Sequence, residues 1–306
     1  MTKVLVATEK PFAPEAVSQI KQIVEGAGFE FALLEKYTNI ETLLEAVKDA
    51  DAMIIRSDKA SQEVINAAKE LKIIVRAGAG YDNIDLAAAT ANQVVAMNTP
   101  GQNSNAVAEL AIGMMIFQAR NQFNGKAGSE LRGKKLGIHA YGNVGRYVAA
   151  MAKGFGMEVY AFDPFVDAKQ IEKDGVGVLR TAEELYSTCQ YISLHIPATE
   201  KTIDSINYAL LKSMPKGATL VNTARKEVIN EIDLKKIFAE RSDFIYLSDI
   251  APDCKEELVK DFSGRFFFTP KKSGAQTAEA NINAGVAAAK QIVGYLKEGD
   301  SKYKLN

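Results

Sequence analysis

Residues 136–164 read LGIHAYGNVGRYVAAMAKGFGMEVYAFDP, a pattern typical of a strand, a glycine turn, a helix and a second strand. Gly142 and Gly145 occupy two glycine positions of the dinucleotide-binding fingerprint, and Ala140 replaces the first glycine. Asp163 follows at the end of the second strand, where an acidic side chain accepts hydrogen bonds from the adenosine ribose hydroxyls. The stretch therefore predicts a Rossmann unit that binds a dinucleotide.

The turn itself would hold the pyrophosphate at the helix N-terminus. Asp163 would repel a ribose 2′-phosphate, which favours NAD over NADP as the cofactor. Arg146 leaves NADP open as an alternative, because a nearby arginine could accommodate that phosphate. His139, inside the first strand, is interpreted as a buried structural histidine. The turn residues expected to contact the cofactor are Gly142, Asn143, Val144 and Gly145.

The bulk composition describes an ordinary globular protein. Its 306 residues suggest two domains, and 47% hydrophobic residues with a net charge of −1 argue against a general nucleic-acid binder. The N-terminus, MTKVLVATEKP, resembles neither a signal peptide nor a membrane span. With only Cys189 and Cys254, a disulfide framework or structural zinc site is not expected. We expect a reduced, soluble, cytoplasmic protein without a metal site.

Short β-branched or aromatic runs alternate with amphipathic helical runs along the chain, which predicts an α/β protein with parallel sheets. The runs are too many for one open sheet, so we expect two doubly wound parallel sheets. The expected strands are 3–7, 29–34, 52–56, 72–76, 94–98, 136–140, 158–163, 191–196, 218–223, 244–249 and 265–269.

Two long apolar helical runs, 103–120 and 275–297, could join the domains. The second is rich in alanine and glycine, which suits close helix packing. If this helix returns the chain to the first sheet, residues 1–98 and 281–306 form the N-terminal domain. Residues 99–280 then form the dinucleotide-binding domain.

Five further motifs occur in order along the chain: RAGAGYDNIDL (76–86), NTPGQNSNAVAEL (98–110), LHIPATEKT (194–202), NTARKEVINE (222–231) and SDIAPD (248–253). Together with the glycine turn, they resemble the D-2-hydroxyacid dehydrogenase family, and within it the short D-3-phosphoglycerate dehydrogenases that lack a regulatory domain. The resemblance covers essentially the whole chain. It implies a Rossmann NAD domain and a flavodoxin-like substrate domain, the latter formed by residues 1–98 and 281–306, with a cleft between the two.

The resemblance implies further residues around the cofactor. His195 ends a strand at the carboxyl edge of the sheet, where open α/β sheets bind ligands. In this family that histidine lies beside the cofactor and is not the catalytic base. Asp249 resembles the family's acid near the nicotinamide carboxamide. The full additional set is Asn103, His195, Ile196, Pro197, Thr202, Thr223, Ala224 and Asp249.

Arginines at strand ends are the expected substrate ligands. By resemblance, Arg225 in NTAR binds the substrate carboxylate and polarises the C2 oxygen. Arg56 and Arg76, with Lys59 as a possible third cation, could form a pocket across the cleft from the nicotinamide. Converging arginines in a near-neutral protein favour an anionic tail, such as phosphate. Ser57 is a further expected substrate contact. So are Ala77, Gly78 and Ala79, in the glycine turn after Arg76, where backbone N–H groups could face a carboxylate.

The family's His–Glu acid/base pair is missing. The histidine normally follows a Thr-Pro, but here the stretch reads FFFTPKKSGAQTAEA (266–280). Counting forward from the Thr-Pro gives Lys271, whereas counting back from GAQT gives Lys272. At the glutamate position, counting from the SD pair gives Cys254, with Asp253 beside it. A lysine needs no carboxylate to fix a ring tautomer, so the two losses are chemically consistent.

We therefore predict that a lysine is the proton-transfer group. An ordinary lysine, with a pKa of about 10.4, is protonated at neutral pH and can donate a proton during ketoacid reduction. Hydroxyacid oxidation needs it partly neutral, which predicts a more alkaline optimum for that direction. The open alternative is that both lysines are surface charges.

The implied activity is NAD-dependent oxidation of D-3-phosphoglycerate in serine biosynthesis by a homodimer, whose two-fold interface the helix at 103–120 helps to form. One alternative is a glyoxylate/hydroxypyruvate reductase or another 2-hydroxyacid dehydrogenase. A different class is a non-catalytic NAD-sensing binding protein, which the loss of the His–Glu pair supports.

Overall fold

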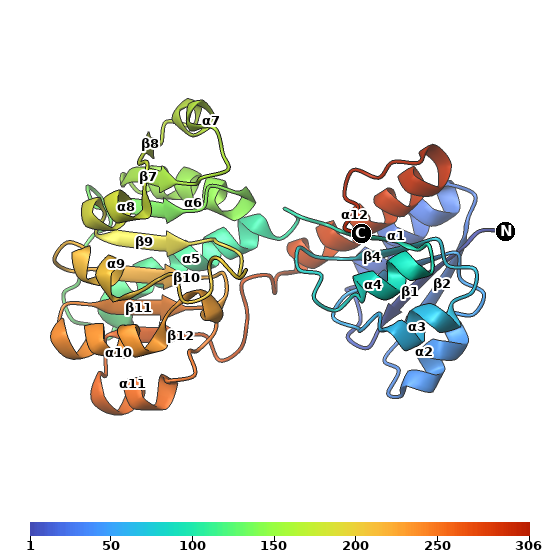
Figure 1. Ribbon diagram of the computed structural model, residues 1–306, viewed down its shortest axis with the longest axis horizontal. Helices are drawn as coiled ribbons and strands as arrows, with labels where there is room; N and C mark the ends of the chain where they lie inside the picture. Colours follow the sequence, from blue (N-terminus) through green and yellow to red (C-terminus); the bar gives the residue numbers. More distant parts are fainter. The chain divides into compact units, whose positions relative to one another are not determined.

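The computed structural model describes all residues from 1 to 306 and divides into two compact units (Figure 1). Met1–Asn103 and Gln276–Asn306 make up the first unit, and Ser104–Ala275 the second. The first unit contains a five-stranded parallel sheet in the order β2-β1-β3-β4-β5, the flavodoxin-like arrangement. Its strands are β1 (Lys3–Thr8), β2 (Glu30–Glu35), β3 (Ala52–Ile55), β4 (Ile73–Arg76) and β5 (Val95–Asn98).

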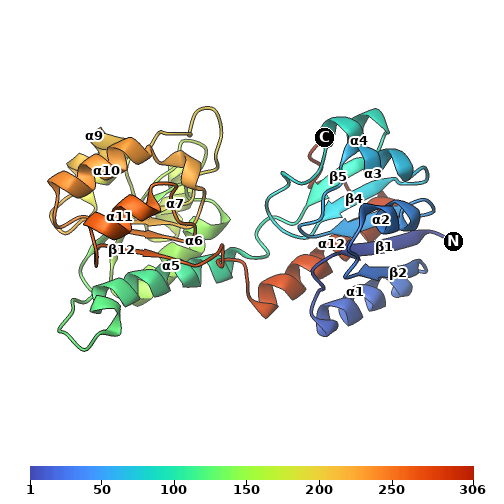
Figure 2. The same cartoon turned by 90° about the horizontal axis from the view of Figure 1, so that it is seen from below.

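Helices cover both faces of this sheet because its buried strands alternate their side chains between the two. Met53 packs towards one face and Ile54 towards the other. The first face is covered by α2 (Ile40–Ala46), α3 (Gln62–Ala67) and α4 (Leu86–Ala91), and the second by α1 (Pro14–Gly26) and α12 (Ala278–Glu298) (Figure 2). Gly285 lets α12 approach α1 closely, since a Cβ there would lie 2.8 Å from Ile20 Cδ1.

The second unit contains a seven-stranded parallel sheet in the order β12-β11-β10-β9-β6-β7-β8, in which β6 and β9 are neighbours at the point where the strand order reverses. This is the Rossmann order extended by one strand. Its strands are β6 (Lys135–His139), β7 (Glu158–Phe162), β8 (Gly177–Val178), β9 (Tyr191–Leu194), β10 (Thr219–Asn222), β11 (Ile245–Ser248) and β12 (Phe266–Phe268).

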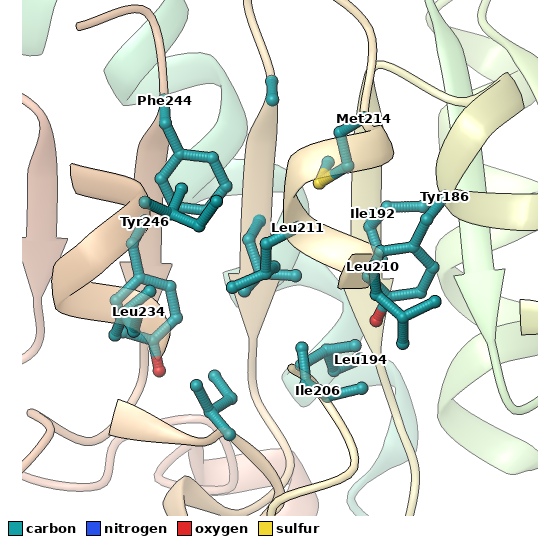
Figure 3. Close-up of a cluster of buried hydrophobic side chains, with 14 of the residues drawn as sticks. Tyr186, Ile192, Leu194, Ile206, Leu210, Leu211, Met214, Leu234, Phe244 and Tyr246 are labelled. Atoms are coloured by element: carbon teal, nitrogen blue, oxygen red, sulfur yellow. The ribbon is translucent and has the colours of Figure 1, made fainter. Parts of the chain in front are cut away.

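Two hydrophobic clusters sandwich this sheet. On β10, Leu220 joins the cluster drawn in Figure 3, and the next residue, Val221, joins the cluster on the opposite face. The first cluster packs under α8 (Ala182–Thr188), α9 (Tyr208–Ser213), α10 (Glu231–Glu240) and α11 (Lys255–Asp261). The second packs under α5 (Ser104–Ala119), α6 (Asn143–Gly154) and α7 (Ala168–Lys173). Short 3₁₀ turns occupy Asn121–Phe123 and Lys226–Val228.

The predicted α/β class with two parallel sheets is confirmed. Each expected strand is present with ends shifted by one or two residues, but the sequence analysis missed β8. That strand has only two residues and contains Gly177, so it carries almost no hydrophobic pattern. None of the helices combines the length and apolar character needed to cross a membrane.

Candidate active site

The glycine turn joins β6 to α6 as the fingerprint requires. Gly142 precedes the helix in an extended conformation, and a Cβ on it would meet no protein atom within 4 Å. Gly145 lies against the Ala140 carbonyl oxygen, just after β6, and against the Ile138 side chain, with no room for a Cβ. Ala140 adopts φ +79°, a left-handed conformation that glycine tolerates better. The backbone thus has a positive φ at the position of the fingerprint's first glycine, although an alanine occupies it.

Asp163, just beyond β7, is held by two backbone amides. Its Oδ2 accepts a hydrogen bond from Tyr141 N at 2.8 Å, and Oδ1 accepts one from Phe165 N at 2.8 Å. Each oxygen keeps a further lone pair that could accept a ribose hydroxyl. Arg146, the residue that raised the possibility of NADP, lies over the Tyr141 ring and 3.9 Å from Asp174. The Arg146 guanidinium therefore interacts with an aromatic ring and a carboxylate of its own unit.

Both histidines are held in the neutral form. Burial lowers the pKa of His139 to about 4, and the ring lies beside Tyr186 with Nδ1 3.3 Å from its hydroxyl. His139 is thus a structural residue packed against its aromatic neighbours. Burial, and then the neighbouring His139, lower the pKa of His195 to about 3. Its Nε2 lies 2.9 Å from Ser193 Oγ, and its backbone N–H donates to His139 O.

The loop after β9 is closed by Thr202. Its hydroxyl lies 2.5 Å from Pro197 O and accepts a hydrogen bond from Thr199 N at 2.8 Å. These hydrogen bonds of Thr202 stabilise the loop that contains His195, Ile196 and Pro197. Asn103 immediately precedes α5 and is half-buried.

At the end of β10, Asn222 organises the residues that follow it. Its Oδ1 accepts a hydrogen bond from Ala224 N at 3.0 Å, and its Nδ2 donates to Arg225 O at 2.9 Å. Arg225 is half-buried, and Nη1 donates to Ala224 O at 3.0 Å. The Thr223 hydroxyl is buried without a hydrogen-bond partner. An unsatisfied hydroxyl at this edge of the sheet is the kind of group that a bound ligand satisfies.

Asp249, at the end of β11, is 2% exposed and binds the loop after β12. Its carboxylate accepts hydrogen bonds from Ser273 N at 2.7 Å and Gly274 N at 2.8 Å, and it lies 3.0 Å from the Thr269 hydroxyl. Lys271 and Lys272 lie on this loop with exposed side chains. The carboxyl ends of β10, β11 and β12 thus place Arg225, Asp249 and the two lysines after neighbouring strands.

No carboxylate replaces the missing glutamate at Cys254. Burial, and then the adjacent Glu231, raise the pKa of this thiol to about 12, so it remains protonated. Glu231 instead accepts hydrogen bonds from the backbone N–H groups of Asp253 and Cys254. The Asp253 side chain binds Lys226 at 2.5 Å. The nearby acids therefore stabilise the loop after β11.

In the first unit, Arg56 is bound by its surroundings. Its Nη1 donates to the carbonyl oxygens of Lys10 and Pro11 at 3.1 and 2.9 Å, its guanidinium lies 5.0 Å from the centre of the Phe12 ring, and Nη2 lies 2.5 Å from Asn281 Oδ1. This set of contacts uses much of the hydrogen-bonding capacity of the guanidinium. The neighbouring Ser57 and Lys59 are exposed.

In the glycine turn after β4, the backbone N–H groups expected to face a substrate carboxylate bind other protein groups. The Ala77 amide donates to Ile55 O at 2.8 Å, and the Gly78 amide donates to Thr99 Oγ1 at 2.7 Å. These two N–H groups therefore support the turn and do not face a ligand. Arg76 Nε donates to Arg56 O at 3.0 Å, and the Arg76 guanidinium passes so close to Gly78 that a Cβ there would lie 1.7 Å from Nη1. The Ala79 carbonyl oxygen accepts a hydrogen bond from Asn98 at 2.6 Å.

Several residues that build these sites were not singled out from the sequence. Asn222 and Asp58 are buried polar residues that organise the loops containing Arg225 and Arg56. Asp58 accepts hydrogen bonds from Glu9 N and Tyr37 Oη, both at 2.7 Å. Asn222 is the last residue of β10, and Asp58 lies three residues after the end of β3. A polar residue at or shortly after the end of a buried strand was the available signal for both.

The comparisons with known proteins agree with this arrangement. Residues 105–261 match the family model described as the NAD binding domain of D-isomer specific 2-hydroxyacid dehydrogenase. The chain belongs to the D-isomer specific 2-hydroxyacid dehydrogenase family. NAD is the cofactor of its second unit. The open space at Gly142, the packed Gly145 and the unpartnered Thr223 hydroxyl all fit this cofactor.

Named relatives within the family differ in length and substrate. D-3-phosphoglycerate dehydrogenase of Methanocaldococcus jannaschii is 34% identical over 97% of this chain, which spans 58% of that protein. Hydroxypyruvate reductase of Thermotoga maritima is 32% identical, with 86% of this chain and 90% of that protein aligned. The NAD⁺-bound 3-phosphoglycerate dehydrogenase of Entamoeba histolytica is 49% identical, with a TM-score of 0.88 over 100% of this chain and 98% of that chain.

Proposed function

We propose that this protein oxidises D-3-phosphoglycerate to 3-phosphohydroxypyruvate, a step of serine biosynthesis, with a lysine as the proton acceptor. The observation that carries the proposal is the placement of Arg225 and of the Lys271–Lys272 loop after neighbouring strands, at the carboxyl edge of the NAD-binding sheet. The names of the relatives from Methanocaldococcus jannaschii and Entamoeba histolytica support the substrate.

Each group has a chemical role that its structure suits. Bound NAD supplies the hydride acceptor. Arg225 binds the substrate carboxylate and stabilises negative charge on the C2 oxygen, because a guanidinium offers a fixed charge and parallel donors. Lys271 or Lys272 accepts the C2 hydroxyl proton when neutral and returns it in the reverse direction. Arg56 and Arg76 hold the phosphate end, in a homodimeric, cytoplasmic enzyme.

The test is an NADH assay with 3-phosphohydroxypyruvate on the wild type, Lys271→Ala and Lys272→Ala. We expect one lysine variant to lose at least about 100-fold in kcat, the lower end of the usual contribution of general acid catalysis. Lys260→Ala, an exposed lysine on α11, is the matched control. Full activity in both loop variants would contradict the lysine role, and NADH binding without turnover would favour a binding protein.

The Thermotoga maritima relative supports a second candidate, because its hydroxypyruvate reductase aligns over 90% of its own length. Arg56 also has several acceptors within its own unit, which weakens the case for a phosphate ligand at that residue. Comparing kcat/KM for 3-phosphohydroxypyruvate and hydroxypyruvate separates the two activities. A preference for the unphosphorylated acid would favour the reductase.

A further inference from the structure

Asp249 carries a buried negative charge whose hydrogen-bond donors come from one short loop. An unpaired carboxylate in such a place is costly unless several hydrogen bonds stabilise it. Here the donors are the backbone N–H groups of Ser273 and Gly274, with the hydroxyl of Thr269 shared between Oδ1 and the Asp249 carbonyl oxygen. Charged acceptors make stronger hydrogen bonds than neutral ones, so the carboxylate and the loop stabilise each other.

These contacts bracket the two lysines. Thr269 is fixed before them, by its hydroxyl and by its backbone N–H, which donates to Ser248 O at 3.1 Å. Ser273 is fixed after them, and its hydroxyl donates to Lys271 O at 2.7 Å. Both ends of the segment that contains Lys271 and Lys272 are therefore hydrogen-bonded to the Asp249 carboxylate.

We propose that Asp249 is a positioning residue that fixes the backbone of the lysine loop so that one ammonium group is presented for proton transfer. The inference rests on the proposed function of a lysine as the acid/base group. Asp249 would then position the lysine loop in addition to contacting the nicotinamide carboxamide, the role that the family resemblance implies.

Two independent substitutions disturb the contact. Asp249→Asn keeps the size of the side chain but replaces one acceptor oxygen by an NH₂ donor, which must face a loop N–H group. Gly274→Ala keeps the carboxylate but places a Cβ 2.9 Å from its Oδ2, so the loop and the carboxylate must move apart and their contact is disturbed. The matched controls are Asp261→Asn, on the exposed end of α11, and Gly154→Ala, where a Cβ meets nothing within 4 Å.

Trypsin reports directly on the loop, because it cleaves after lysine and the segment must open to enter the protease. Under native conditions the cleavage rate follows the population of the open form. We expect cleavage after Lys271 and Lys272 to be at least about 10-fold faster in both variants than in the wild type and controls, a loss of about 1.4 kcal/mol of local stability. Unchanged rates in both variants would overturn the proposal.

Steady-state kinetics test whether the position matters for the reaction. We expect kcat to fall about 100-fold in Gly274→Ala while KM for the ketoacid changes less than about threefold, because a small displacement of an acid/base group affects the chemical step. Faster cleavage with unchanged kcat would overturn the positioning role. If the wild type has no turnover, the proposed function fails, and the cleavage rates still decide whether Asp249 holds the loop. If Asp249→Asn does not fold, Gly274→Ala decides both outcomes.

Discussion

A Cβ atom on Gly145 would lie 2.5 Å from the carbonyl oxygen of Ala140. That distance is far inside van der Waals contact, so α6 can approach β6 only because residue 145 has no side chain. Gly142, three residues earlier, faces open space. The two glycines therefore have different tasks, one in packing the helix and one in leaving room for the cofactor.

This difference predicts opposite effects of the same substitution. Gly145→Ala should destabilise the protein by about 1–3 kcal/mol, because the helix must shift outward. Gly142→Ala should leave the free energy of unfolding unchanged but weaken NADH binding about 10-fold or more, since the methyl group occupies space that the pyrophosphate needs. Urea unfolding and NADH fluorescence titration measure the two effects. Equal loss of stability in both variants would show that the division of tasks is wrong.

Ala140→Gly should stabilise the protein. A left-handed conformation costs an alanine about 1–2 kcal/mol, and the greater flexibility of glycine in the unfolded chain offsets about 0.5–1 kcal/mol of that. The net gain should therefore be about 0.5–1 kcal/mol in urea unfolding. Gly154→Ala, at an exposed helical position, provides a reference for the opposite exchange. A destabilised Ala140→Gly protein would mean that the Ala140 methyl group makes contacts that outweigh its strain.

Acid should destabilise the protein through His139 before its carboxylates are titrated. The folded-state pKa of His139 is about 4, below the ordinary value of 6.5, so the unfolded chain binds the proton more tightly. Stability is therefore complete above about pH 6.5 and falls as the pH decreases towards 4, by up to about 1.4 kcal/mol per pH unit for this residue.

The free energy of unfolding, measured from pH 7.5 to 4.5, checks this expectation. His139→Gln keeps a polar side chain near Tyr186 but does not titrate, so its profile should be flatter than that of the wild type. His195, with its pKa lowered to about 3, should leave part of the slope in that variant. Parallel profiles for the two proteins would contradict the assignment of the slope to His139.

Asp163 should set the preference for NADH over NADPH. Its carboxylate is fixed by two backbone amides, so it cannot easily turn away from a 2′-phosphate, and we expect a preference of about 100-fold or more. Asp163→Ser should reduce that ratio by improving kcat/KM for NADPH. Arg146→Ala should leave it unchanged, because Arg146 is placed against Tyr141 and Asp174. A further loss of NADPH activity in Arg146→Ala would assign the phosphate to that arginine.

The sequence predicted the sheets well because their inner strands, such as β3 and β10, are buried on both faces and read as apolar runs. It also placed the glycine turn and Asp163, whose spacing is a property of the local chain. The partners of the functional residues were not predictable in the same way. The hydrogen bonds from Ser273 and Gly274 to Asp249, and from Glu9 and Tyr37 to Asp58, join residues that lie far apart in sequence. Such contacts depend on strand order and have no local pattern.

The position of α12 has a consequence for synthesis on the ribosome. One face of the first sheet is covered by α1 and by α12, whose Ala288 and Ile292 are fully buried there. The ribosome makes this helix after the whole of the second unit, so Val4 and Val6 emerge long before their covering helix exists. The second unit is continuous and can complete its core first. Until α12 is synthesised, one apolar face of the first sheet stays partly exposed. During this interval the nascent chain would need protection from aggregation.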